Sequence, residues 1–175
     1  GFDTFLATLK SPIIALLIST VFTGVIQSSA ATIGIVQALA LSGGITWEMA
    51  IPLVLGANIG TCVTALIGSL GTNKNAKRVV VMHFSVNAFG SIICMIIMYI
   101  LKAAGVTLLS TVVSMVGVAI IHTLFNGINT VLLLPIKKLL IKFCELVVPD
   151  KEEQQHTVFL DERIFNNSPL AISEC

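Results

Sequence analysis

The chain has 175 residues, of which 55% are hydrophobic and only 11% charged, and its mean hydropathy is +0.98. A soluble domain usually carries about 25% charged residues, so a soluble enzyme and a disordered protein are both strongly disfavoured. The net charge of +1 provides no general attraction to nucleic acid. The cysteines are widely scattered, with no CxxC pair and no metal-ligand spacing. Because the chain starts at Gly1, close to apolar sequence, we expect it to be cut from a longer protein.

The first apolar stretch, residues 12–42, predicts a re-entrant helical hairpin. Gln27-Ser28-Ser29 interrupts this stretch near its middle, and the two sides would be about 22 Å and about 18 Å long as helices. Neither side crosses a hydrocarbon core of about 30 Å by itself. A single broken helix that crosses once is the alternative, but the whole stretch is long for one crossing.

Three further apolar stretches predict transmembrane helices. Residues 49–72 and 79–101 each have the length of a single crossing. Residues 105–136 are long for one crossing, which predicts either a tilted helix or a helix broken near residues 122–127.

Lysine and arginine positions predict the orientation of these crossings. Two crossings separate the basic loops at 74–78 and 137–142, so both loops can face the cytoplasm, where basic loops are enriched. The turn at 42–48 then lies outside. We predict a membrane domain at residues 1–144 and, at 145–175, a cytoplasmic linker that leads into a missing domain.

Two segments within the apolar stretches combine small residues, hydroxyls and one carboxamide, and each predicts a break in a helix. They are Thr23–Thr32 and Leu55–Thr64. Non-helical backbone at membrane depth is tolerated only where it is buried in protein or lines a wet cavity. The N-terminus of a half-helix offers N–H groups to an anion, and the opposite end offers carbonyl groups to Na⁺. We therefore expect an ion-binding site at these breaks.

Each motif also has a purely structural interpretation. Gly56 and Gly60 form a GxxxG pair that lets two helices approach closely, and isolated hydroxyls usually bond back to their own helix. Three consecutive polar side chains, from Gln27 to Ser29, are harder to explain by packing because they are costly in lipid. Two polar stripes are interpreted as sources of inter-helix hydrogen bonds: His83 with Asn87 and Ser91, and His122 with Asn126 and Asn129.

The charge pattern restricts the chemistry of such a site. No lysine or arginine lies within the predicted crossings, so a bound anion would need helix N-termini and a bound cation to neutralise it. This favours cation-coupled anion transport over an arginine-lined channel. No nucleophile–base pair, carboxylate pair or metal-ligand cluster lies in a plausible pocket, so the chain is not expected to be an enzyme.

Three segments in this order resemble the type II sodium/phosphate cotransporter family. Gln27–Ile35 resembles its QSSS signature, and Gly56–Ala65 resembles the GANIGT segment that follows in bacterial members. His122–Asn126 resembles the later HxLFN element of the same family. The resemblance covers residues 15–140, and Leu160–Arg163 is more weakly similar to the start of the PhoU-like domain that many bacterial members carry.

The resemblance implies an all-α integral membrane protein that carries out sodium-coupled symport of inorganic phosphate across the plasma membrane. Family members hold two inverted repeats, each with one such signature, and this chain contains one. It is therefore expected to supply one half of an inverted-repeat transporter, with a re-entrant hairpin plus broken and continuous transmembrane helices. The expected partners are phosphate, Na⁺ as the coupling ion, the lipid bilayer, and the missing first repeat or a second copy of the chain. No other cofactor is expected.

The resemblance also implies the binding residues. The family's phosphate- and sodium-binding roles carry over onto Gln27, Ser28, Ser29, Thr32, Asn58, Thr61 and Thr64, with Na⁺ ligands expected from Gln27, Ser28, Asn58 and Thr61. Ala30 stands where the signature usually has a third serine, which leaves the sodium stoichiometry and the anion open. Two alternatives remain: a transporter or exporter of another anion on the same scaffold, and a membrane anchor for a PhoU-like regulatory domain.

Overall fold

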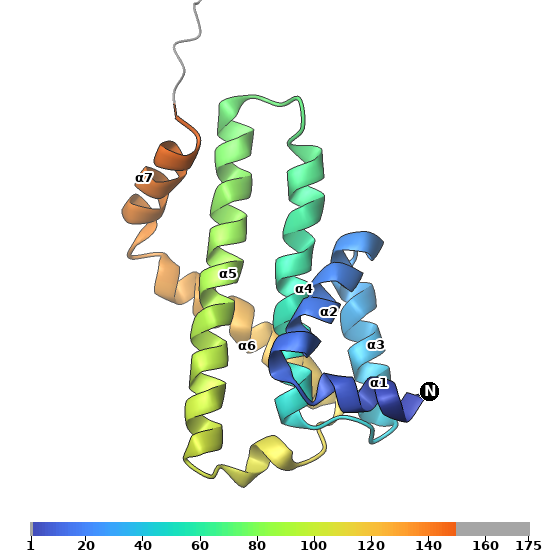
Figure 1. The fold of residues 1–175 in the computed structure, drawn as a ribbon. Coiled ribbons are helices and arrows are strands. Elements are labelled where there is room, and N and C mark those ends of the chain that lie inside the picture. Colours follow the sequence, from blue (N-terminus) through green and yellow to red (C-terminus); the bar gives the residue numbers. More distant parts are fainter. Residues whose placement is uncertain (1, 150–175) are drawn as a thin grey trace, which may run out of the picture.

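The structure, a computed structural model, describes residues 2–149, and this part of the chain is helical as predicted (Figure 1). The elements are α1 (Phe2–Leu9), α2 (Pro12–Ile26), α3 (Ser29–Leu41), α4 (Trp47–Gly68), α5 (Lys74–Ala103), the 3₁₀ helix η1 (Thr107–Ser110), α6 (Met115–Leu133) and α7 (Lys137–Val147). Predictions that concern residues 150–175 lie outside the described residues.

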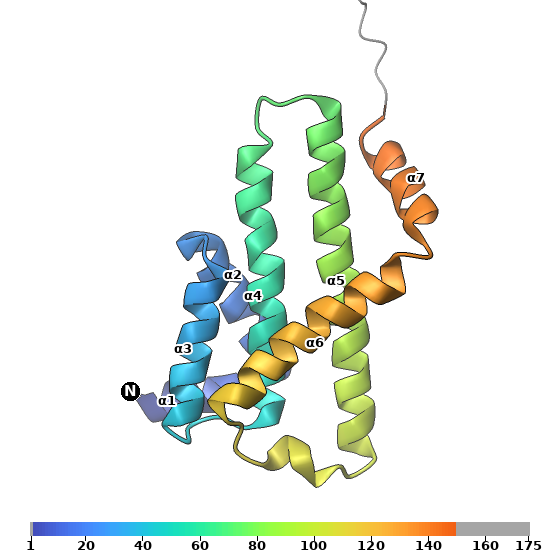
Figure 2. The same ribbon diagram turned by 180° about the vertical axis from the view of Figure 1, so that it is seen from behind.

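The hairpin predicted for residues 12–42 is present. Helix α2 rises beside α4, and α3 returns in the opposite direction, so the hairpin starts and ends at the same end of the bundle (Figures 1 and 2). The chain reverses at Gln27, whose φ of 58° is the only positive value of a non-glycine residue in the described part of the chain. The tip of the hairpin lies beside α4 and short of its far end (Figure 1). The interrupted stretch is therefore two half-length helices.

The second predicted break, at Leu55–Thr64, is wrong, because α4 is continuous through it. Its two glycines face α2. A Cβ on Gly56 would lie 2.3 Å from the carbonyl oxygen of Leu16, and a Cβ on Gly60 would lie 2.5 Å from the Cβ of Thr23. The glycines therefore serve close helix packing and leave the backbone of α4 intact.

Helices α4, α5 and α6 are the described helices that are long and apolar enough to cross a membrane. Helix α5 has 30 residues and α6 has 19. The stretch at 105–136 divides into η1 and a continuous, oblique α6, which crosses in front of α4 and α5 in the view of Figure 2. Of the two alternatives predicted for this stretch, the tilted helix is the one present, although it begins only at Met115. The alternative break near residues 122–127 is absent.

The core lies between the hairpin and the first half of α4. Its centre is formed by small and branched side chains of α2, α3 and α4, among them Ala15, Val36, Leu53 and Val54. By contrast, most outward faces of α5 and α6 carry exposed apolar side chains. An apolar outer surface on a helix bundle is suited to contact with lipid.

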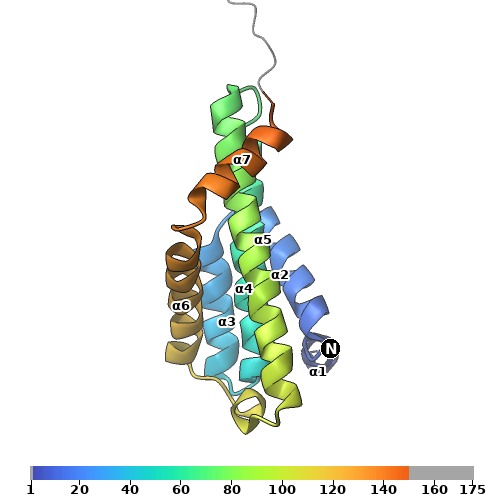
Figure 3. The same cartoon turned by 90° about the vertical axis from the view of Figure 1, so that its left-hand side faces the viewer.

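The two ends of the bundle differ in charge. At one end, next to the turn between α3 and α4, Lys102 forms an ion pair with Glu48. At the other end lie the basic start of α5 and helix α7 (Figures 1 and 3). The Nε atom of Arg78 donates a hydrogen bond of 3.0 Å to the carbonyl oxygen of Val148, which ties the end of α7 to α5. The two basic loops therefore lie at the same end, as their sequence positions predict.

Candidate functional site

The tip of the hairpin presents the N-terminus of α3. Ser28 is the N-cap residue of α3, and its Oγ atom accepts a hydrogen bond of 3.2 Å from the N–H of Ala31. Within the described residues, the N–H groups of Ser29 and Ala30 have no acceptor, as expected in the first turn of a helix. Gln27, the residue before this N-cap, is exposed. The tip therefore offers N–H groups, hydroxyls and a carboxamide within one turn of chain.

A buried hydrogen bond fixes this geometry. The Oγ1 atoms of Thr23 and Thr32 lie 2.8 Å apart and join the two arms of the hairpin just below its tip. The Oγ1 atom of Thr32 also donates to the carbonyl oxygen of Ser28 at 3.3 Å. Thr23 packs in turn against Gly60 of α4. Thr32, a predicted binding residue, thus has its hydroxyl engaged inside the hairpin.

Thr23 is not among the binding residues predicted from the sequence. Its buried hydroxyl connects the tip to α4, although it precedes the signature motif by one helical turn. The available signal was its spacing of four residues from Gln27, because one helical turn separates residues on the same face.

A second polar group lies where α4 crosses α6. The Oδ1 atom of buried Asn58 accepts a hydrogen bond of 3.4 Å from the Nδ2 atom of Asn126, and its Nδ2 atom donates to the carbonyl oxygen of Val54 at 3.0 Å. The same Asn126 amide donates to the carbonyl oxygen of His122 at 2.9 Å. The hydroxyl of Thr61 donates to the carbonyl oxygen of Asn58. The inter-helix bonding predicted for this stripe is confirmed at Asn126.

The predicted site residues therefore fall into two groups. Gln27, Ser28, Ser29 and Thr32 lie at the hairpin tip, and Asn58 and Thr61 lie on α4 with Asn126 beside them. The two groups adjoin through the packing of Thr23 on Gly60, but no hydrogen bond among residues 2–149 links them directly. Thr64 is exposed on α4, one turn beyond Gly60.

A third polar cluster lies between α5 and α6. The carboxamide of Asn129 is seated on Gly90, where a Cβ would come within 2.2 Å of its Nδ2 atom. This Nδ2 atom and the Oγ atom of Ser91 are buried without a partner. Within the described residues no group of three or more His, Cys, Asp or Glu side chains could hold a metal ion.

Comparison with known proteins agrees with the family resemblance found in the sequence. The profile of the Na⁺/Pi-cotransporter family matches residues 2–134. The chain is 31% identical over 137 residues to "Uncharacterized protein YqeW" of Bacillus subtilis, covering 78% of this chain and 44% of that protein. It is 25% identical over 177 residues to "Putative inorganic phosphate export protein YjbB" of Escherichia coli, covering 99% of this chain and 32% of that protein.

The similarity extends to animal proteins but covers only part of each relative. Human "Sodium-dependent phosphate transport protein 2B" is 37% identical over 81 residues, which are 44% of this chain and 12% of that protein. The chain spans less than half the length of each of these relatives. No solved structure matches the chain. Because the family profile covers most of the sequence, and because three helices have the length and apolarity to span a bilayer, this chain belongs to the Na⁺/Pi-cotransporter family of membrane transporters.

Proposed function

We propose that this chain forms one half of a sodium-coupled symporter of inorganic phosphate in the plasma membrane. The observation that carries the proposal is the hairpin tip, where two half-length helices end at Gln27 and Ser28 beside the membrane-length helix α4 (Figure 1). The tip lies short of the end of α4, so a ligand bound there would be within the depth of the bilayer. A chain reversal at this depth is expected where a protein binds ions.

Phosphate binding at the tip rests on the N-terminus of α3. The N–H groups of Ser29 and Ala30, together with the hydroxyls of Ser28 and Ser29, supply donors to an anion, and the helix dipole favours negative charge at this position. No lysine or arginine occurs between Ser11 and Asn73, and therefore none occurs in α2, α3 or α4. Binding of a phosphate ion at the tip therefore requires a bound cation for charge compensation.

Sodium binding would use neutral oxygen atoms near the phosphate. Gln27 and Ser28 offer a carboxamide oxygen and a hydroxyl at the tip, and Asn58 and Thr61 offer the same groups on α4. The Oδ1 atom of Asn58 accepts only the 3.4 Å hydrogen bond from Asn126, so exchange of this bond for a Na⁺ contact would cost little. Na⁺ and phosphate would then bind together, which couples their transport.

The second half of the site would come from another repeat. The tip carries exposed Gln27, and Thr64 is exposed on α4, although polar groups at membrane depth need a protein or water partner. The first repeat of the full-length protein, or a second copy of this chain, would provide that partner. In this arrangement residues 1–144 form the transport domain and residues 145–175 a cytoplasmic linker, and relative motion of the two repeats gives alternating access.

The test is uptake of labelled phosphate by liposomes that contain the full-length parent protein, with and without an inward Na⁺ gradient. We expect sodium-dependent uptake, and we expect Gln27→Ala to lower it at least about tenfold because an ion ligand is lost. Gln37→Ala is the matched control, since Gln37 lies within α3, away from the tip, and its Nε2 donates only to the carbonyl oxygen of Met115. Equal uptake by the two variants would contradict the assignment of the site.

Export of phosphate is a second candidate function. It is favoured by the printed name of the Escherichia coli relative, which aligns over 99% of this chain. The direction can be measured with vesicles preloaded with phosphate. Sodium-independent efflux from such vesicles, without sodium-driven uptake, would replace symport by export and leave the proposed phosphate contacts unchanged.

A further inference from the structure

The basic end of the bundle carries lysines that the transport site does not use. In the described residues, the basic side chains at this end come from the start of α5 and from α7: Lys74, Lys77, Arg78, Lys137, Lys138 and Lys142. Glu145 is the single acidic side chain of α7. Among residues 2–149, basic side chains therefore outnumber acidic ones from the α4–α5 loop along the slanting helix α7 (Figures 1 and 3).

Helix α7 has three distinct faces. Leu140, Cys144 and Val148 recur every four residues and are buried or half-buried, which indicates the face toward α5. Leu139 and Leu146 lie on a second face and are 66% and 80% exposed. Lys138, Lys142 and Glu145 share the third face of the helix. A helix with an exposed apolar face beside a basic face is typical of the membrane interface.

The exposed apolar surface of the bundle extends up to the α4–α5 loop and the start of α5. Leu70, just beyond α4, is 72% exposed, and Val79 on α5 is 66% exposed. Lys77 precedes Val79 by two residues, which is about 3 Å along a helix. Helix α5 has 30 residues, about 45 Å, so its ends must extend beyond a hydrocarbon core of about 30 Å. Lys77 is therefore placed where lipid headgroups begin.

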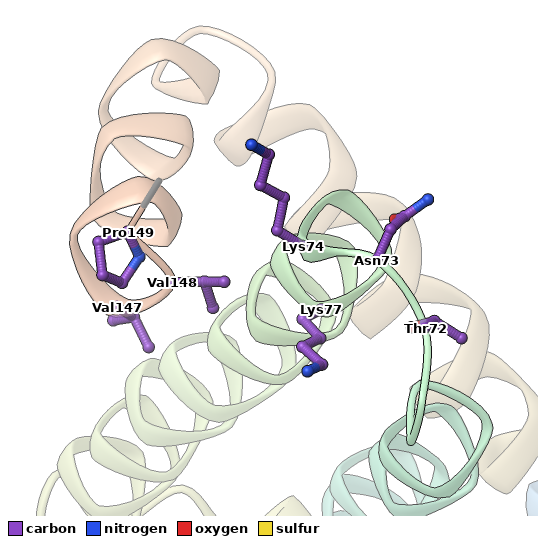
Figure 4. A pocket seen from close by; sticks show the side chains of 7 residues that line it. All are labelled: Thr72, Asn73, Lys74, Lys77, Val147, Val148 and Pro149. Atoms are coloured by element: carbon purple, nitrogen blue, oxygen red, sulfur yellow. The ribbon is translucent and has the colours of Figure 1, made fainter. Parts of the chain in front are cut away.

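A cleft joins these two elements. It has a volume of about 440 Å³ and lies between the α4–α5 loop with the start of α5 and the end of α7. Figure 4 shows Lys74 and Lys77 on one side of it and Val147, Val148 and Pro149 on the other. One wall is thus basic and the other apolar, which matches the phosphate and the glycerol-ester region of a phospholipid.

We infer that this end of the protein binds anionic phospholipids, with α7 lying in the headgroup layer and the lipid phosphate held by lysines of α5 and α7. The lysines of α7, the exposed apolar face of the same helix and the level of Lys77 each point to a lipid surface. Basic side chains next to a membrane helix attract anionic lipids over distances set by ionic screening. The inference does not depend on which ion the hairpin tip transports.

The test measures thermal unfolding of the full-length protein in detergent with added phosphatidylglycerol or phosphatidylcholine. We expect phosphatidylglycerol to raise the unfolding midpoint by several degrees and phosphatidylcholine to have less than half that effect. The double variant Lys138→Gln/Lys142→Gln should lose most of the response to phosphatidylglycerol. The matched control is Lys10→Gln, which should keep the full response, because Lys10 is exposed between α1 and α2 and α1 lies at the opposite end of the bundle (Figure 1).

Several results would overturn the inference. Equal stabilisation by the two lipids would show that charge is not recognised, and an unchanged response of the double variant would remove the lysines of α7 from the site. Reproduction of the effect by inorganic phosphate at equal concentration would assign it to the transported ion. A stabilisation that stays unchanged as salt rises from 0.05 M to 0.5 M would also contradict it, because screening weakens surface charge interactions.

Discussion

Two segments of similar composition have opposite structures in this protein. Thr23–Thr32 and Leu55–Thr64 both combine glycine, hydroxyl residues and one carboxamide within an apolar stretch. The first interrupts its stretch and reverses the chain, whereas the second lies inside the continuous helix α4. Polar composition at membrane depth therefore does not by itself predict a break in a helix.

The difference lies in where the polar groups find their partners. At the tip, Ser28 caps the new helix and the hydroxyls of Thr23 and Thr32 bond to each other across the turn. In α4, Asn58 and Thr61 donate to carbonyl oxygens of their own helix. A break is stable when side chains replace the lost backbone hydrogen bonds, and it is unnecessary when they bond back to an intact helix.

The largest effect is expected from Gly56→Ala, which tests whether the glycines of α4 serve packing. The new Cβ would lie 2.3 Å from the carbonyl oxygen of Leu16 and 2.8 Å from the Cβ of Ser19, so α2 would have to move. We expect a loss of about 3 kcal/mol or a failure to fold, measured as folded yield and thermal unfolding in detergent. Gly68→Ala is the control, because a Cβ at Gly68 meets no atom within 4 Å. Equal stability of the two variants would contradict the packing role.

The second prediction separates capping from anion binding at Ser28. Aspartate is as good an N-cap residue as serine, so the free energy of unfolding of Ser28→Asp should stay within about 0.5 kcal/mol of the parent value. Its negative charge would repel phosphate from the N-terminus of α3, and phosphate uptake should fall at least about tenfold. Ser28→Ala should instead destabilise the protein by about 1 kcal/mol. Normal uptake by the aspartate variant would remove the anion from this position.

A smaller effect is expected at the α4–α6 crossing. The hydrogen bond of 3.4 Å between Asn58 and Asn126 should give a coupling of about 0.6 kcal/mol in a double-mutant cycle with alanine, the usual value for polar pairs in membranes. If Asn58 also binds Na⁺, Asn58→Ala should raise the Na⁺ concentration needed for half-maximal uptake, whereas Asn126→Ala should change it little. Identical sodium dependence in both variants would make the pair purely structural.

Part of this structure could be predicted from the sequence. The hairpin was predictable because each side of Gln27-Ser28-Ser29 is too short to cross a bilayer. The continuity of α4 was not, because the GxxxG pair fits a break and a close packing contact equally well until the path of α2 is known. The role of Thr23 and the bond between Asn58 and Asn126 depend on contacts between distant parts of the chain. A single sequence does not specify such contacts.

The smallest structural effect is expected from Ala30→Ser, which restores the third serine of the family signature. Ala30 is exposed in the first turn of α3, where serine is tolerated, so stability should change by less than about 0.5 kcal/mol. An added hydroxyl beside the free N–H groups of the tip changes the ligand set without moving the backbone. If the third serine is an ion ligand, this variant alone should lower the Na⁺ concentration needed for half-maximal uptake or change the number of Na⁺ ions coupled to each phosphate. Unchanged sodium dependence would instead show that the tip of this protein coordinates its ions without that hydroxyl, through Gln27, Ser28 and the helix N-terminus.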